Sequence, residues 1–164
     1  MNLSALTIDG TQNMLGSLTK NQCERVLLSE LVGRLGCHAS GKMYIVPLSY
    51  VFEKGYIYAH AKEGLKITMM RKNPNVCFQV DEIDDMAHWR SVVIWGKFEE
   101  ITTPAAQDKT LKLLVDRFRI YNTSESVKPV FRTPDQEPLK EKKPVLFRIA
   151  VEEVTGRFEN TEST

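Results

Sequence analysis

The sequence lacks several features that mark well-defined classes of protein. No apolar run in its 164 residues approaches the roughly 20 residues that a membrane-spanning helix needs. The formal net charge of +1 gives no electrostatic reason to expect a nucleic-acid or membrane partner. The Gly-x-Ser-x-Gly elbow, the Walker phosphate loop, the Gly-x-Gly-x-x-Gly fingerprint and the His-Glu-x-x-His zinc motif are also missing. None of these signatures therefore assigns a reaction.

Cysteine and histidine are scarce as well. Cys23, Cys37 and Cys77 form an odd set without a Cys-x-x-Cys pair, which favours free thiols in a reducing compartment. The three histidines lack zinc-ligand spacing, so we expect no metal site. Residues 1–16 have neither a basic start nor a sustained apolar core, so we predict no signal peptide and a cytoplasmic location.

The composition and the apolar pattern indicate a mainly β protein. Hydrophobic residues make up 42% of the chain and charged residues 26%, which is ordinary for one globular domain of this length. Strands and helices do not alternate in the way that a parallel doubly wound sheet requires. Strands are expected at residues 32–39, 43–52, 56–61, 76–81, 90–101 and 145–151. Six antiparallel strands with flanking helices predict a small β-barrel that closes its own edges.

The domain limits follow from the polar segments. We assign residues 19–158 to a single domain, residues 1–18 to a flexible N-terminal arm and residues 159–164 to a polar tail. Residues 82–88 are expected to be an acidic link between two strands. Residues 122–144 form a long segment rich in proline, lysine and glutamate, and this segment is a candidate lid over a ligand site.

One short segment combines a strand with the start of a helix. Tyr56, Tyr58 and His60 share one face of the expected strand, opposite a face of small and aliphatic residues. Gly64 stands at the junction, and Lys66 lies in the first turn of the helix. Free backbone N–H groups at a helix start, together with a lysine, suit a phosphate. The sequence therefore predicts an anion site here.

The order and spacing of several short motifs resemble a known family. The motifs are Val32-Gly33-Arg34-Leu35, Val46-Pro47, His60-Ala61 followed by Gly64 and Lys66, Arg71-Lys72-Asn73-Pro74, and Arg90-Ser91-Val92 with Gly96. Together they resemble the split-barrel proteins that bind flavin mononucleotide (FMN) and are related to pyridoxamine 5′-phosphate oxidase. Within this family the nitroimidazole-resistance branch is the most similar. The resemblance covers residues 26–98, with weaker support from residues 146–157.

This resemblance implies a six-stranded antiparallel split barrel that forms a homodimer, with FMN in each of two clefts at the subunit interface. Lys66 takes the place of the phosphate-binding lysine, and Ser91 takes the place of a glutamine that contacts the flavin. Trp89 and Arg90 are placed to reach the flavin of either subunit. The full set of implied cofactor contacts is Val46, Pro47, Leu48, Ser49, Ala59, His60, Gly64, Lys66, Trp89, Arg90 and Ser91.

Each of these residues also has an ordinary structural explanation. Pro47 is compatible with a simple edge strand, Trp89 with a core position, and His60 with a hydrogen-bonded interior histidine. The sequence also departs from the oxidases. Leu65 stands where they carry an arginine beside the lysine, and their arginine-rich C-terminal substrate motif is absent. We therefore do not expect pyridoxamine phosphate oxidase activity.

The function expected from the resemblance is an FMN-dependent oxidoreductase. A reduced nicotinamide would be the electron donor, and a small molecule such as a nitroaromatic or a quinone would be the acceptor. No catalytic acid or base is evident from the sequence. Two alternatives remain open: a flavin-binding protein without turnover, and a split barrel that binds haem through His38, His60 or His88.

Overall fold

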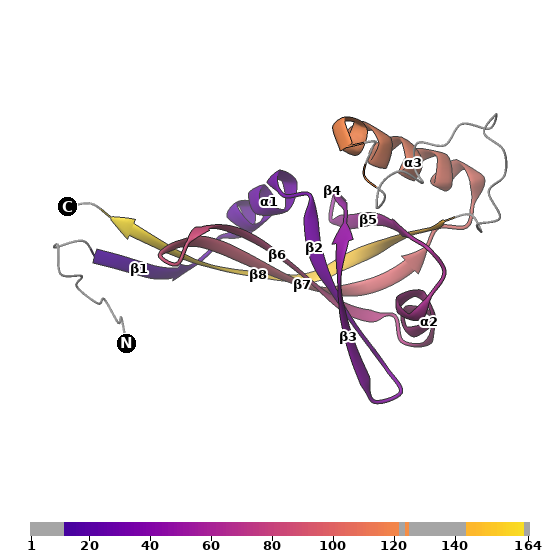
Figure 1. The fold of residues 1–164 in the computed structure, drawn as a ribbon, viewed down its shortest axis with the longest axis horizontal. Helices are drawn as coiled ribbons and strands as arrows, with labels where there is room; N and C mark the ends of the chain where they lie inside the picture. Colours follow the sequence, from indigo (N-terminus) through magenta and orange to yellow (C-terminus); the bar gives the residue numbers. More distant parts are fainter. Residues whose placement is uncertain (1–11, 122–123, 125–143, 163–164) are drawn as a thin grey trace.

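A single antiparallel sheet dominates the protein (Figure 1). The structure is a computed structural model, and it describes residues 12–121, 124 and 144–162. The order of the strands is β3-β2-β6-β7-β8-β5-β4, and β1 pairs with β8 outside this path. The strands are β1 (Gln12–Ser17), β2 (Val32–Ala39), β3 (Lys42–Ser49), β4 (Val51–Glu53), β5 (Tyr56–Ala61), β6 (Asn75–Asp85), β7 (His88–Glu100) and β8 (Val145–Glu162). The predicted antiparallel split-barrel fold is confirmed, but the predicted number of six strands is wrong, because the described chain has eight.

Within the described residues, three α-helices and one short 3-10 helix accompany the sheet: α1 (Lys20–Ser29), α2 (Leu65–Lys72), α3 (Pro104–Phe118) and η1 (Arg119–Tyr121). Thr19 caps α1, because its hydroxyl accepts from the Gln22 amide and the Gln22 side chain accepts from the Thr19 amide. None of the helices in the described residues has the length and apolar character needed to cross a membrane.

The hairpins at β2–β3 and β4–β5 have tight two-residue turns. Ser40 and Gly41 have φ angles of 53° and 74°, and Lys54 and Gly55 have φ angles of 49° and 80°. Two consecutive positive φ angles are typical of the turn whose twist matches that of the flanking strands. These two turns fix the register of strands that flank the candidate site.

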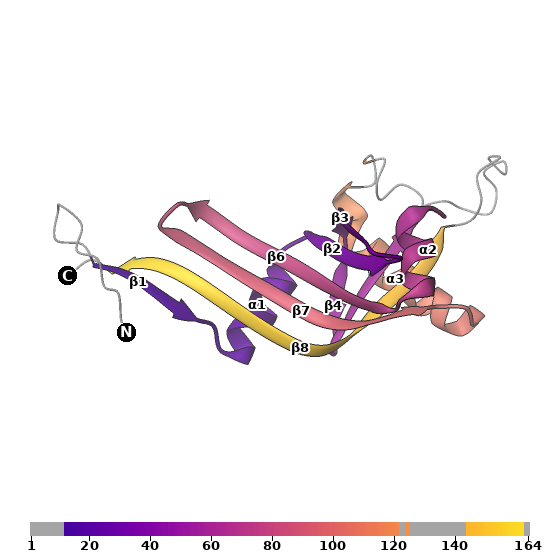
Figure 2. The ribbon, with the colours of Figure 1, turned by 90° about the horizontal axis from the view of Figure 1, so that it is seen from below.

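Strands extend into the three segments that were expected to be an acidic link, a flexible arm and a polar tail. Residues 82–85 continue β6, so that only residues 86–87 remain between β6 and β7. Residues 12–17, expected to belong to a flexible arm, form β1, which pairs with residues 157–162 of β8. The expected polar tail is therefore also strand as far as residue 162, while residues 1–11 and 163–164 lie outside the described part of the chain. These segments form a ribbon that extends beyond the core (Figure 2). Because such a ribbon is held by backbone hydrogen bonds, it leaves no apolar pattern in the sequence.

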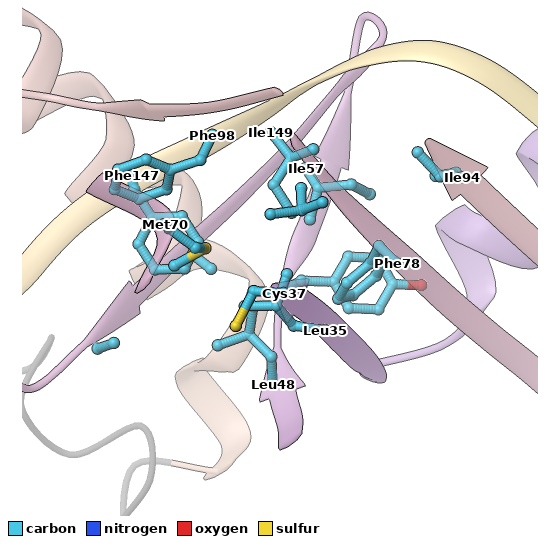
Figure 3. Close-up of a cluster of buried hydrophobic side chains, with 14 of the residues drawn as sticks. Leu35, Cys37, Leu48, Ile57, Met70, Phe78, Ile94, Phe98, Phe147 and Ile149 are labelled. Atoms are coloured by element: carbon cyan, nitrogen blue, oxygen red, sulfur yellow. The ribbon is translucent and has the colours of Figure 1, made fainter. Parts of the chain in front are cut away.

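The core lies on one side of the sheet, which we call the inner face. Leu35, Phe78, Ile94, Phe147 and Ile149 come from four different strands and are fully buried together (Figure 3). The helix α1 adds Cys23, Val26 and Leu27 to this cluster, and α2 adds Ile67, Met69 and Met70. The inner face therefore carries the packing that holds the strands in place.

The helix α3 packs on the opposite side of the sheet, which we call the outer face. Leu114 and Phe118 of α3 form a second buried cluster with Tyr58 and Leu146. The segment at β5 is therefore buried on both faces: its aromatic face lies in the second cluster, and Ile57 lies in the first. The predicted two-sided character of β5 is confirmed.

The remaining outer face, on strands β3, β2, β6 and β7, is not covered by any helix in the described chain, and we call it the open face. Its exposed apolar side chains include Met43, Ile45, Val32 and Trp95, which are 73%, 69%, 44% and 44% exposed. The in-register pairs Val32–Ser49, Arg34–Pro47 and Asp81–Ser91 also lie on this face.

Candidate functional site

The barrel is open between β3 and β5, and this opening is bordered by predicted site residues. The strands β3 and β4 stand at the two ends of the hydrogen-bonded order, yet β3 and β5 contact each other. The strand β4 pairs only with residues 56–58 of β5, so Ala59 and His60 extend past it. Two strand edges without ladder partners among the described strands therefore face this opening. Pro47 fits an edge strand because it has no N–H to donate.

Side chains alternate between the two faces of a strand, so each of these residues can offer a ligand either its side chain or only its backbone groups. Val46 and Leu48 point to the inner core, whereas Pro47 and Ser49 lie on the open face. Ala59 is fully buried on the inner face. Val46, Leu48 and Ala59 can therefore offer a ligand their backbone groups only. His60 lies on the outer face and is 7% exposed.

The helix α2 begins directly after this edge. Gly64 is its N-cap and provides no side-chain cap, so the first amides of the helix are not capped by a side chain. Lys66 is half-buried in the first turn and forms no ion pair within the described chain. Burial raises the pKa of the Cys37 thiol on the adjoining strand, Cys77 raises it further, and Lys66 opposes this rise. The start of α2 therefore combines an uncompensated cation with free amides.

Arg71 fixes this helix start in place. Its guanidinium donates to both carboxylate oxygens of Glu63 at 2.8 and 2.9 Å and to both of Glu100 at 2.8 Å. Glu63 precedes the N-cap of α2, and Glu100 ends β7. The hydrogen bond from Arg71 lowers the pKa of Glu100. The bidentate pairs thus tie the entry of α2 to the sheet.

Ser91 lies in a polar network in the middle of the open face. The Gln79 carboxamide donates to the Ser91 hydroxyl at 3.0 Å and also to the Asp81 carboxylate. Arg34 approaches the other oxygen of Asp81 at 3.6 Å, and its side chain remains 51% exposed. Sequence reasoning did not assign Arg34, Gln79 or Asp81 to the site. The alternation of residues 76–81 already placed Gln79 and Asp81 on one face, but only the strand order reveals that Ser91 and Arg34 are their neighbours.

Trp89 and Arg90 lie elsewhere, near the tip of the β6–β7 hairpin. This tip and α2 lie on opposite sides of the molecule in both views (Figures 1 and 2). The Trp89 indole donates to Glu159 at 3.0 Å, and Arg90 pairs with Glu82 at 3.0 Å. Both line a cavity of about 210 Å³ beside α1, and Arg90 also lines an adjacent one of about 290 Å³. One chain therefore does not bring Trp89 and Arg90 together with Lys66.

The histidines and cysteines do not form a metal or disulfide site. His38 is exposed on β2, His60 is buried on β5, and His88 at the start of β7 pairs with Asp85 at 2.9 Å. The described residues contain no group of three or more His, Cys, Asp or Glu side chains that could hold a metal ion. The three cysteines are free thiols, as predicted. The candidate lid, residues 122–144, lies outside the described residues except for Ser124 and Pro144.

A family model for pyridoxamine 5′-phosphate oxidase matches residues 19–158. The chain belongs to this family. Among solved structures, an FAD-binding protein from Mesorhizobium loti is 30% identical with a TM-score of 0.71, over 92% of this chain and 99% of that one. A pyridoxamine 5′-phosphate oxidase-like fold is also shared with a structure from Bacteroides thetaiotaomicron assigned to 5-nitroimidazole antibiotic resistance. The two sequences are 19% identical, and the structures match with a TM-score of 0.63 over 92% of each chain. The similarity is therefore one of fold alone.

A curated relative of unassigned function, from Rhizobium meliloti, matches part of this chain. The two sequences are 33% identical over 90 residues, which cover 55% of this chain. The match spans 58% of the length of that relative.

Proposed function

We propose that this protein is a flavoprotein that binds the phosphate of FMN at the start of α2. The observation that carries the proposal is the placement of Lys66, half-buried and without a carboxylate partner among the described side chains. A partly buried cation at a helix start, where the helix dipole is also positive, favours the binding of an anion. The adjacent uncapped amides and Gly64, which leaves room for a close approach, fit a phosphate dianion. Because Leu65 replaces a second basic residue, this phosphate site has one cation fewer than that of the oxidases.

The flavin ring would lie along the β3 edge and the open face. Backbone groups of Val46 and Leu48 and the outward side chains of Pro47 and Ser49 would border it. Ser91 lies on β7, separated from β3 by β2 and β6, so it would contact the flavin of the partner subunit. Ala59 and His60 would lie beside the ribityl phosphate chain. When bound, the flavin supplies the redox chemistry, while these residues orient it and exclude water. We choose FMN over FAD because the site supplies one phosphate-binding cation; identification of the cofactor released from purified protein checks this choice.

We propose that the protein is a homodimer, because the two groups of predicted cofactor contacts do not come together within one chain. Trp89 and Arg90 lie at the start of β7, by the tip of the β6–β7 hairpin, and this tip is on the opposite side of the molecule from α2, which carries Lys66. They would therefore serve the flavin of the partner subunit. The open face carries exposed apolar side chains such as Met43, Ile45 and Trp95, and apolar surface of this kind favours burial in an interface.

The proposed reaction is electron transfer from a reduced nicotinamide to a small acceptor, such as a nitroaromatic or a quinone. We infer this reaction from the family resemblance and from the chemistry of the cofactor. Within the described chain, no residue in the site is arranged as a catalytic acid or base, so the flavin itself would carry out the redox step. Oxidation of a reduced nicotinamide that depends on both bound FMN and the acceptor tests the reaction. A flavin that stays bound but never turns over would favour a storage or sensing role, and a haem spectrum in place of flavin would favour the haem-binding alternative.

The phosphate assignment is tested by Lys66→Ala with two ligands, FMN and riboflavin, which lacks the phosphate. We expect FMN to bind about 10- to 100-fold more weakly, because a charge-assisted contact to the phosphate is lost. Riboflavin affinity should not change. The melting temperature should stay the same or rise slightly, since a lysine opposes the helix dipole at this end.

Lys20→Ala is the matched control, because Lys20 also occupies the first turn of a helix but is exposed at a helix that Thr19 caps. This variant should bind both ligands as the wild type does. Equal affinity of the Lys66→Ala and wild-type proteins for FMN would rule out Lys66 as the phosphate-binding residue.

A further inference from the structure

A carboxylate stands immediately before the phosphate site that we propose at the start of α2. Glu63 precedes the N-cap Gly64, and Lys66 lies three residues after Glu63, in the first turn of the helix. An acid at this point complements the positive end of the helix dipole, and a lysine three residues away is within its reach. Glu63 is therefore an anion that could occupy the site in place of a phosphate.

The Glu63 carboxylate is instead bound to a different partner. Both of its oxygens accept from the Arg71 guanidinium, at 2.8 and 2.9 Å. No side chain caps the start of α2, and the described residues include no ion pair between Glu63 and Lys66. The helix start therefore keeps its free amides and its lysine available, although an acid is adjacent to it.

Arg71 can hold Glu63 because Arg71 is itself held by the sheet. Its Nε and Nη2 atoms donate to the two oxygens of Glu100 at 2.8 Å, so the guanidinium lies between two carboxylates. A single exposed ion pair contributes little, but bidentate pairs that share one arginine fix the geometry of each side chain. Arg71 lies in the last turn of α2, and Glu100 ends β7. The network therefore binds the Glu63 carboxylate to the last turn of α2 rather than to the first.

We propose that Arg71 is a positioning residue for phosphate binding, which acts by keeping the Glu63 carboxylate out of the anion site. This proposal rests on the proposed function, because it requires a phosphate at the start of α2. Without Arg71, the Glu63 carboxylate would turn to the free amides and to Lys66, and it would compete with the phosphate. Arg71 thus preserves the positive charge of the site without contacting the ligand.

The test compares the affinities of three variants for FMN and riboflavin, by titration of the flavin fluorescence. Arg71→Met should weaken FMN about three- to tenfold, which corresponds to the strength of a helix cap, and should leave riboflavin unchanged. Only FMN should respond, because only its phosphate competes with the carboxylate. Glu63→Gln should bind FMN at least as tightly as the wild type does. The double variant, Arg71→Met with Glu63→Gln, should recover the FMN affinity of Glu63→Gln, because the competing charge is gone.

This recovery distinguishes the proposed role from a purely structural one. If Arg71 only ties α2 to the sheet, the double variant also lacks the tie and should bind FMN as weakly as Arg71→Met does. Arg117→Met is the matched control, because Arg117 also ties the end of a helix, by donating to the carbonyl oxygens of residues 28–30 at the end of α1. It should lower the melting temperature without changing either affinity.

The outcomes also separate this inference from the proposed function. If the wild-type protein does not bind FMN, or if Lys66→Ala binds FMN as tightly as the wild type, the proposed phosphate site fails and this inference fails with it. If Lys66→Ala loses affinity for FMN but Arg71→Met does not, only the role of Arg71 is overturned. The same conclusion follows if Arg71→Met weakens both flavins equally, or if the double variant does not recover.

Discussion

Gly33→Ala should destabilise the protein, because a methyl group at this position has no room. A Cβ on Gly33 would lie 2.3 and 2.6 Å from two ring carbons of Phe78 and 2.9 Å from the carbonyl oxygen of Gln79. The Phe78 ring is fully buried and packs edge-on against Tyr50, with 5.0 Å between the ring centroids. The ring therefore cannot swing aside, and β2 and β6 would have to move apart. Overpacking of this kind costs about 1–3 kcal/mol, of which about 0.4–1 kcal/mol is offset by the smaller entropy of the unfolded chain.

The net effect expected for Gly33→Ala is a loss of about 1–2 kcal/mol, or a fall of about 2–8 °C in melting temperature for a chain of this size. Thermal unfolding followed by circular dichroism measures it. Gly64→Ala is the control, because the nearest atom to its added Cβ would be 4.0 Å away and its φ of 167° is available to any residue. This control should stay within about 0.5 kcal/mol of the wild type. Equal melting temperatures for the two variants would refute the packing argument at Gly33.

Two further predictions concern the open face and the tie at α2. Ile45→Glu should convert the dimer to a monomer, because it places a charge on the open face that the partner would cover. The monomer should stay folded, because Ile45 is 69% exposed in the single chain. Ile120→Glu is the control: Ile120 lies on η1 and is 80% exposed, so sedimentation should show an intact dimer. The second concerns acid stability. Because Arg71 lowers the pKa of Glu100, their interaction stabilises the fold above the ordinary Glu100 pKa of 4.5 and is lost as the pH falls through the lower folded value. Arg71→Met should therefore flatten the loss of melting temperature below pH 4.5, and an unchanged pH profile would contradict this role.

The elements that form the core were predictable from the sequence, because burial leaves a pattern. The alternation of residues 76–81, the capping signal at Thr19 and the glycine of the Lys54-Gly55 turn each correspond to the observed element. A glycine inside a strand, such as Gly33, is typical of a close approach of neighbouring atoms, and the Phe78 ring and the Gln79 carbonyl provide it. Local chemistry determines each of these features.

The ribbon and the polar network could not be predicted, because neither depends on a local pattern. The pairing of residues 12–17 with residues 157–162 joins the two ends of the chain through backbone hydrogen bonds that do not require particular side chains. Likewise, Arg34, Gln79 and Ser91 are far apart in sequence and become neighbours only through the strand order and register. The position of Lys66 in the first turn of α2 was predictable, because its signal, a lysine and a glycine at a helix start, is local.

The visible absorption spectrum of the purified protein, recorded after FMN is added and the excess is removed, tests the central claim most directly. The account predicts that paired flavin bands remain with the wild-type protein and are lost from Lys66→Ala. A colourless wild-type protein, or one with a Soret band in place of the flavin bands, would contradict it.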